Sequence, residues 1–171
     1  TQIGPPGEWL WRTEWDKGIA YNFGRSELGS NTYLQLYKST DGKIFTKHGT
    51  EYFKGTYPNE TSPVFTEDGT CYVLLRRNGE DASTAQLGRA DPPYYNFTWK
   101  DLGVKIGGPE MIQLPNGQFL ATVRLYDEGE YTAICFIDPE AGSLKKLLRL
   151  PSGGDTSYAG MVLDKNNILW V

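Results

Sequence analysis

The sequence predicts an all-β chain built from β-propeller blades, and three observations support this prediction. The 171 residues include 20 Gly, 10 Pro, 5 Trp, 11 Tyr and 7 Phe, a composition typical of short strands joined by tight turns. Signals for tight turns recur along the chain at intervals of 51 and 48 residues. Each interval holds four short strand-like runs, and four strands in a period of about 50 residues are typical of a propeller blade.

Three glycine-containing turns mark the repeat: Asp16–Gly18, Glu67–Gly69 and Pro115–Gly117. A weaker turn, Asp164–Asn167, follows after a similar interval. Turns of this kind between apolar runs predict hairpins, because type I′ turns need positive φ. The runs before the turns predict first strands at Trp9–Trp15, Ser62–Thr66, Glu110–Leu114 and Tyr158–Leu163. The runs after the turns predict second strands at Ile19–Phe23, Thr70–Leu75, Gln118–Val123 and Ile168–Val171.

The second half of each period repeats as well. Third strands are predicted at Tyr33–Lys38, Ala85–Arg89 and Thr132–Ile137, and fourth strands at Ile44–His48, Thr98–Leu102 and Leu144–Leu150. The predicted blades cover residues 8–55, 56–106 and 107–153, followed by a first hairpin at 154–171. A β-sandwich also needs many short strands, but it does not require landmarks that recur in register. We expect residues 1–171 to be a partial propeller domain of about three and a half blades from a longer protein, inactive by itself.

Composition argues against several classes of function. The formal net charge is −4 and the Lys and Arg residues are scattered, which argues against a nucleic-acid-binding protein. No run approaches the roughly 20 apolar residues of a membrane span. Cys71 and Cys135 lie in apolar runs, so we expect two buried thiols rather than a disulfide. His48, the one histidine, and two separated cysteines make no recognisable metal site, and no metal or other cofactor is predicted.

Three arginines recur in register: Arg25, Arg76 and Arg124 each lie seven residues after the turn glycine of their blade. Equivalent positions on adjacent blades would bring such cations to one mouth of the channel, where guanidinium groups could hold a carboxylate. The structural alternative is that each arginine ends a second strand and pairs with a nearby carboxylate. For Arg25 we expect a solvated loop, because Gly24 and a Ser-, Gly- and Asn-rich stretch surround it.

The segments that lead into the blades are polar where a purely structural strand would be apolar. The candidates to face the channel are Arg12, Glu60, Glu110, Asp155 and Tyr158. Their structural alternative is that Asp155 caps a turn and Tyr158 packs between blades. Recurrence at one blade position favours the functional interpretation of the group.

Several motifs resemble the sialidase (neuraminidase) superfamily of Asp-box propellers, and in particular a bacterial sialidase-like group. Asn59-Glu60 followed by Leu75-Arg76-Arg77 resembles the family pattern of a glutamate that precedes a substrate-binding arginine. The stretch Gly153–Gly160 is similar to a later segment that carries a tyrosine nucleophile, and Ser39–Phe45 is similar to an Asp box, one residue short. The resemblance covers essentially the whole chain and includes Glu8–Arg12.

The resemblance implies a six-bladed propeller when complete, and a retaining glycosidase that removes terminal sialic acid or a related acidic sugar. Tyr158 would be the nucleophile, because a neutral phenol does not repel the carboxylate of the substrate as a carboxylate nucleophile would. Glu60 would take the phenol proton and Arg76 would bind the substrate carboxylate. The partner would be a glycan and no cofactor is required. By analogy we expect a secreted, periplasmic or cell-surface protein.

The sequence departs from the family pattern in two places. The segment Gly108–Gln113, where a third carboxylate-binding arginine is expected, has none. Arg124 on the next strand is the substitute that we predict, Arg12 is a second candidate, and Glu110 is a further substrate-binding candidate. The first binding arginine and the acid/base aspartate are expected upstream of Thr1. Asp155 is the candidate acid within this chain.

Two alternatives stay open. One is a propeller glycosidase that acts on neutral sugars through two carboxylates, Glu60 with Glu110 or Asp155. The other is a non-catalytic glycan-binding or scaffold propeller. Exposed aromatic residues would then stack on sugar rings; the candidates are Trp9, Trp11 and Tyr126.

Overall fold

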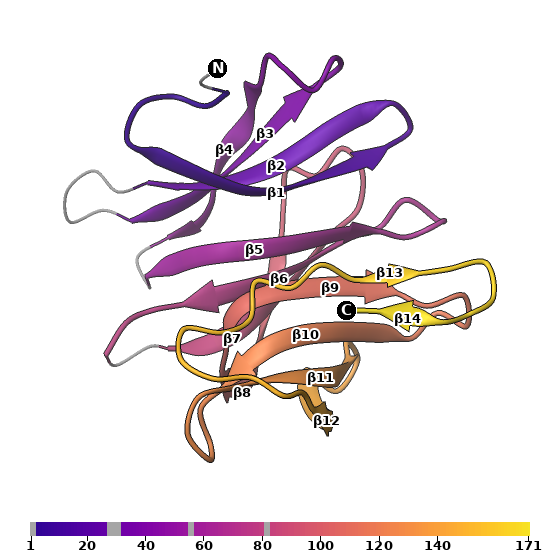
Figure 1. The fold of residues 1–171 in the computed structure, drawn as a ribbon. Helices are drawn as coiled ribbons and strands as arrows, with labels where there is room; N and C mark the ends of the chain where they lie inside the picture. The colour runs from indigo at the N-terminus through magenta and orange to yellow at the C-terminus, as the bar shows by residue number, and fades with distance from the viewer. Residues whose placement is uncertain (1–2, 27–31, 55–56, 81–82) are drawn as a thin grey trace.

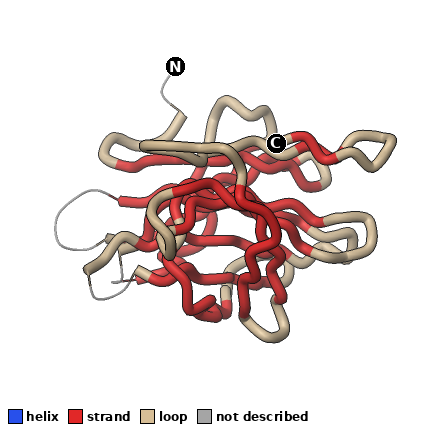
Figure 2. The backbone as a smooth tube through the Cα atoms, turned by 60° about the horizontal axis from the view of Figure 1, so that its bottom comes forward, coloured by secondary structure: helices blue, strands red, loops and turns tan. Residues whose placement is uncertain are grey.

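The computed structural model describes residues 3–26, 32–54, 57–80 and 83–171. Among these residues it contains strands, turns and loops but no helix, as the tube in Figure 2 shows. The strands form three four-stranded antiparallel sheets and one two-stranded hairpin. The prediction of an all-β chain made of four-stranded units is therefore confirmed. The sheets are consistent with the blades of a propeller-like fold, and the described residues do not close a ring.

We call the three sheets blades 1, 2 and 3, in chain order (Figure 1). Blade 1 contains β1 (Glu8–Asp16), β2 (Ile19–Ser26), β3 (Tyr33–Ser39) and β4 (Thr46–Lys54). Blade 2 contains β5 (Pro58–Phe65), β6 (Cys71–Arg77), β7 (Thr84–Ala90) and β8 (Thr98–Lys105). Blade 3 contains β9 (Gly107–Gln113), β10 (Phe119–Leu125), β11 (Tyr131–Asp138) and β12 (Ser143–Arg149). The hairpin consists of β13 (Val162–Leu163) and β14 (Leu169–Trp170).

The first strands of the blades lie side by side, with β5 between β1 and β9 (Figure 1). All three begin earlier than the sequence predicts, β1 by one residue, β5 by four and β9 by three, so that β5 includes Asn59 and Glu60 and β9 includes Gly107. The predicted strand Tyr158–Leu163 is wrong over most of its length, since only Val162 and Leu163 are extended and paired. Tyr158 lies in the loop before them.

Turn chemistry follows from the sequence signals. Gly69 and Gly117 have φ values of 89° and 85°, in the region that favours glycine. In the turn after β3, Asp41 Oδ1 accepts hydrogen bonds from the amides of Lys43 (2.8 Å) and Ile44 (2.9 Å). These donors lower the pKa of Asp41 to about 2.

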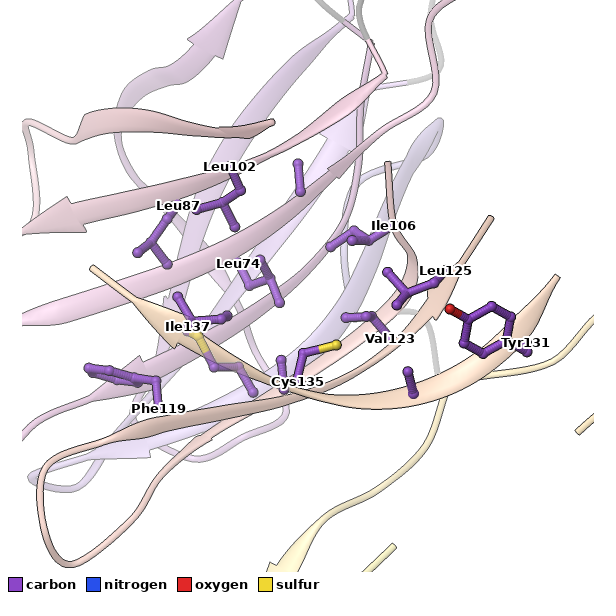
Figure 3. Packing of buried hydrophobic residues seen from close by; sticks show 14 residues of the cluster. Leu74, Leu87, Leu102, Ile106, Phe119, Val123, Leu125, Tyr131, Cys135 and Ile137 are labelled. Carbon is purple, nitrogen blue, oxygen red and sulfur yellow. The ribbon is translucent and has the colours of Figure 1, made fainter. Parts of the chain in front are cut away.

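Two apolar cores join the blades. Between blades 2 and 3, leucines such as Leu74 and Leu87 pack against Phe119, Val123 and Ile137 (Figure 3). Between blades 1 and 2 the core is mainly aromatic, with Tyr21, Phe23, Tyr52 and Tyr94 among its members. Burial of this surface stabilises the blade contacts at about 25 cal/mol per Å² of apolar area.

Both cysteines lie in these cores as free thiols, as predicted from the sequence. Cys71 and Cys135 are fully buried. Burial raises the pKa of Cys135 to about 12 and that of Cys71 further still, so both stay protonated and unreactive at neutral pH. In the part of the chain that is described, no helix is long and apolar enough to cross a membrane.

Candidate active site

Each first strand is interrupted by a β-bulge near the end where the strand begins. The register shifts lie at Leu10/Thr13 in β1, at Pro58/Thr61 in β5, and at Thr122/Arg124 in β10 opposite β9. A bulge bends its strand and changes the direction of the side chains within it. Arg12, Glu60 and Gly108 lie in these three bulges, so the same irregularity in each blade places residues for one site.

Glu60, Arg76 and Tyr158 form a hydrogen-bonded cluster. The Tyr158 hydroxyl donates to Glu60 Oε1 over 2.9 Å, and Arg76 Nη1 donates to the same carboxylate oxygen over 2.7 Å. Arg76 Nη1 also lies 3.2 Å from the Tyr158 hydroxyl oxygen. The side chains of Glu60 and Arg76 are only 5% and 11% exposed, whereas Tyr158 is 45% exposed. The cluster is therefore buried beneath a phenol that solvent can reach.

Two atoms of this cluster are buried without a partner among the described residues: Glu60 Oε2 and Arg76 Nε. Buried polar atoms are nearly always hydrogen-bonded in folded proteins. These two atoms therefore mark the cluster as a polar centre that is not fully satisfied.

The backbone that carries Tyr158 adopts a conformation that side chains rarely take. Ser157 and Tyr158 have φ values of 84° and 58°. The Tyr158 amide donates to the Gly108 carbonyl (3.3 Å), and Ser157 Oγ donates to the same oxygen (3.2 Å). A Cβ on Gly108 would meet the Tyr158 nitrogen at 2.7 Å. Only glycine therefore lets this loop approach β9 so closely.

Arg124 holds one side of the Tyr158 loop. Its Nε donates to the Thr156 carbonyl over 2.8 Å, and its Nη2 forms an ion pair with Asp155. The arginine is 7% exposed at its side chain and the aspartate 82%. The guanidinium also lies 5.7 Å from the centre of the Tyr158 ring. Arg124 thus contacts the buried side of the loop, and Asp155 extends into solvent.

Arg12 holds the other side of the loop. Its Nε lies 2.5 Å from Glu110 Oε2 and 3.2 Å from the Pro109 carbonyl, and its Nη2 donates to the Ala159 carbonyl. Ser62 Oγ donates to Glu110 Oε2 over 3.4 Å. Arg12 therefore links blade 1 to blade 3 and to the residue that follows Tyr158.

The pKa values of Tyr158 and Glu110 are both raised. Burial, followed by the hydrogen bond to Glu60 and its negative charge, raises the pKa of Tyr158. Burial also raises the pKa of Glu110, an effect that the nearby Arg12 guanidinium partly offsets. Tyr158 is a neutral phenol at neutral pH, and its deprotonation needs a base.

Trp11 packs on Tyr158 from β1, with ring centres 6.1 Å apart and an angle of 21° between the planes. The sequence places Trp11 among the exposed aromatic residues but gives no indication of this contact, nor of the contacts of Gly108 and Ser62. For Gly108 a signal is present, since glycine and proline inside a strand often mark a bulge.

The predicted site residues divide into two sets. Glu60, Arg76 and Tyr158 form the cluster, and Arg12, Arg124, Glu110 and Asp155 surround the Tyr158 loop. Arg25 is the exception among the three arginines in register. It belongs to β2 rather than to a solvated loop, and its guanidinium lies 5.4 Å from the centre of the Trp9 ring.

No family model matches the chain, and no curated protein sequence matches it significantly. Solved structures do match. A protein of unknown function from Dyadobacter fermentans has a TM-score of 0.70 and 18% identity, over 85% of this chain and 42% of its own. A GH32 β-fructofuranosidase from Bombyx mori has a TM-score of 0.61 and 16% identity, over 83% of this chain and 37% of its own.

A candidate exo-β-1,3-galactanase from Bifidobacterium bifidum S17 is similar with a TM-score of 0.58 and 14% identity, over 83% of this chain and 51% of its own. The chain thus spans about half or less of the length of these proteins. At these identities the similarity shows the fold alone. The chain has an all-β fold that is shared with glycoside hydrolases.

Proposed function

We propose that the intact protein is a glycoside hydrolase of the sialidase type, in which Tyr158 is the nucleophile and Glu60 its base. The observation that carries the proposal is the 2.9 Å hydrogen bond from the Tyr158 hydroxyl to Glu60, within the range of 2.6–3.2 Å for proton transfer. The fold shared with two carbohydrate-active proteins supports the same class of reaction.

The proton of Tyr158 must leave as the bond to the sugar forms. Because the pKa of the phenol is raised, a phenolate is not available beforehand, and Glu60 Oε1 accepts the proton. The phenol oxygen then bonds to the anomeric carbon, and the glycosidic bond breaks with its electron pair on the leaving oxygen. An acid protonates that oxygen. Asp155 is the candidate from the sequence, and it would have to leave its ion pair with Arg124 to do so. Water then attacks the anomeric carbon and gives its proton to the conjugate base of that acid, the bond between the sugar and Tyr158 breaks, and Glu60 returns the proton to the phenol oxygen.

An acidic sugar fits the charges beside Tyr158. The Arg76 guanidinium is largely buried and contacts both Glu60 and the phenol oxygen. A substrate carboxylate could accept from it, and an arginine fork suits this geometry. A carboxylate nucleophile would be repelled by the negative charge of such a substrate, whereas the neutral phenol is not.

The test is Tyr158→Phe in the full-length protein. Hydrolysis of a sialoside should fall roughly a thousandfold or more, since the nucleophile is lost, while binding of the product sugar is kept. Tyr95→Phe changes another exposed tyrosine, which packs on His48 instead, and should leave the rate unchanged. A Tyr158→Phe variant that keeps most of its activity would contradict the assignment.

A second candidate function rests on Glu110. Its carboxyl is buried and its pKa is raised, as in the general acids of glycosidases that use two carboxylates. In that case Glu60 and Glu110 would act on a neutral sugar, Glu110→Gln would abolish hydrolysis, and Arg76→Ala would be tolerated. If no glycoside from a broad panel is hydrolysed but glycans bind, the protein is a glycan-binding propeller.

A further inference from the structure

A ladder of three aromatic rings leads away from the proposed nucleophile. Trp11 stacks on Tyr158 at 6.1 Å, and Trp9 lies next to Trp11 at 5.9 Å with an angle of 43° between the ring planes. Tyr158 and Trp9, at the two ends, are 45% and 48% exposed.

Strand register places Trp9 on the side of β1 that faces blade 2. Trp9 pairs directly with Arg25, and Arg25 shares its face of β2 with Tyr21 and Phe23. Those two aromatic residues pack in the core between blades 1 and 2. Trp9 therefore lies on the face of blade 1 that is turned toward blade 2.

Trp15 lies on the opposite face of the same strand. It belongs to the same strand and is similarly exposed (54%), but it pairs with Ala20 on the opposite face of β2 and lies beside Gly42 at the far end of the blade. The two tryptophans thus lie in the same strand and are similarly exposed, but they lie on opposite faces of blade 1.

We propose that Trp9, supported by Trp11, is a platform for the sugar next to the one that reacts at Tyr158. The flat, apolar faces of pyranose rings pack on indole rings. The Arg25 guanidinium covers one face of Trp9 at 5.4 Å, so the sugar packs on the other face. The ladder is continuous with the proposed nucleophile. This inference rests on the proposed function. Because the proposed reaction removes a terminal sugar, its neighbour is the leaving group, and the platform selects substrates that carry a sugar in this place.

The test uses the full-length protein and two substrates. In 3′-sialyllactose the leaving group is a disaccharide, and in sialosyl fluoride it contains no ring. Trp9→Ala should lower kcat/KM for 3′-sialyllactose about fivefold to tenfold, the effect of one lost aromatic contact, and leave the fluoride within about twofold. Trp15→Ala is the matched control and should change neither. Equal losses on both substrates, or no loss on either, would overturn the platform.

Failure of the proposed function gives a different result. If the native protein hydrolyses neither substrate, the same variants are titrated with 3′-sialyllactose and binding is followed by tryptophan fluorescence and calorimetry. Weaker binding by Trp9→Ala than by Trp15→Ala, about fivefold or more, would keep the platform as part of a glycan-binding site. Equal binding by the two variants, or no binding by the native protein, would overturn it.

Discussion

Arg76 and Arg124 occupy the same position in blades 2 and 3, seven residues after the turn glycine, and yet their contacts differ. Arg76 donates to a carboxylate and to the Tyr158 hydroxyl, so it lies at the proposed reaction centre. Arg124 donates to the Thr156 carbonyl and pairs with Asp155, so it holds the backbone that carries Tyr158. Both are largely buried and both approach the same tyrosine, one at its oxygen and one at its loop.

The difference comes from what the neighbouring segment supplies. In blade 2 the bulge of β5 places Glu60 beside Arg76, and the guanidinium contacts both this carboxylate and the Tyr158 hydroxyl. In blade 3 the equivalent strand provides Gly108, and the space above it is filled by the Tyr158 loop, whose carbonyls face Arg124. Repeated blades thus give equivalent positions, and the bulge residue and the loop beside each position decide what its arginine contacts.

Between the alanine variants of these two arginines, Arg76→Ala should cause the larger loss of activity. Loss of the charge beside the phenol oxygen and the substrate carboxylate should lower kcat/KM for a sialoside roughly 100-fold to 1,000-fold and should raise KM. Steady-state kinetics at saturating substrate separate the two effects. Arg76→Lys should recover little, because an ammonium cannot reproduce the fork. Unchanged KM in Arg76→Ala would place the substrate carboxylate elsewhere.

Arg124→Ala tests whether this second arginine positions the Tyr158 loop. If Arg124 positions the loop, its loss should lower kcat about 10-fold to 100-fold, as misplaced groups do, and leave KM within about twofold. Hydrogen exchange at the Tyr158 amide should accelerate in this variant and not in Arg76→Ala. Asp155→Asn removes the exposed partner and keeps the Thr156 contact, so it should preserve the exchange rate. A large rise in KM would instead assign Arg124 to the substrate.

Gly108→Ala tests the close approach on which the loop depends. The new methyl would lie 2.7 Å from the Tyr158 nitrogen at a φ of 48°, so the variant should lose about 1–3 kcal/mol of stability and about tenfold in kcat. Gly153→Ala is the control, since a Cβ there meets nothing within 4 Å. Thermal unfolding and kinetics measure both effects, and equal Tm values for the two variants would argue against the contact.

The smallest effect is expected far from the site, at Asp41. Its pKa is held at about 2 by the amides of Ile44 and Lys43, so its stabilising effect is full above pH 4 and is lost as pH falls toward 2. The Tm difference between the native protein and Asp41→Ala should shrink over that interval. A difference that stays constant down to pH 2 would show that the carboxylate charge is unimportant to this turn.

The fold could be predicted from the sequence where local signals decide it. Turn glycines such as Gly69 and Gly117 need positive φ, and strand runs on either side of them alternate or are continuously apolar. The failures lie where distant residues decide. Tyr158 begins a run that the sequence predicts as a strand, Tyr158–Leu163. Contacts from Arg12, 147 residues away, and from Arg124, 31 and 32 residues away, instead hold this segment as a loop.

Only part of the candidate site could be predicted from the sequence. Recurrence in register identified Arg76 and Arg124, and the family resemblance singled out Glu60 and Tyr158, which lie 98 residues apart along the chain. Which arginine contacts the phenol oxygen depends on the bulges and on the packing of one blade against the next, and neither leaves a strong local signal. The sequence does not predict that β2 extends through Arg25, because Gly24 is typical of the end of a strand.

Covalent trapping tests the assignment of the nucleophile most directly. A fluorinated sialosyl fluoride slows release of the sugar, so incubation with the full-length protein should leave the sugar bonded to the enzyme. Peptide mass spectrometry should then locate the added mass on the peptide that carries Tyr158, and the Tyr158→Phe variant should not be labelled. A label on Glu60, Glu110 or Asp155 would contradict the tyrosine mechanism and favour the mechanism that uses two carboxylates.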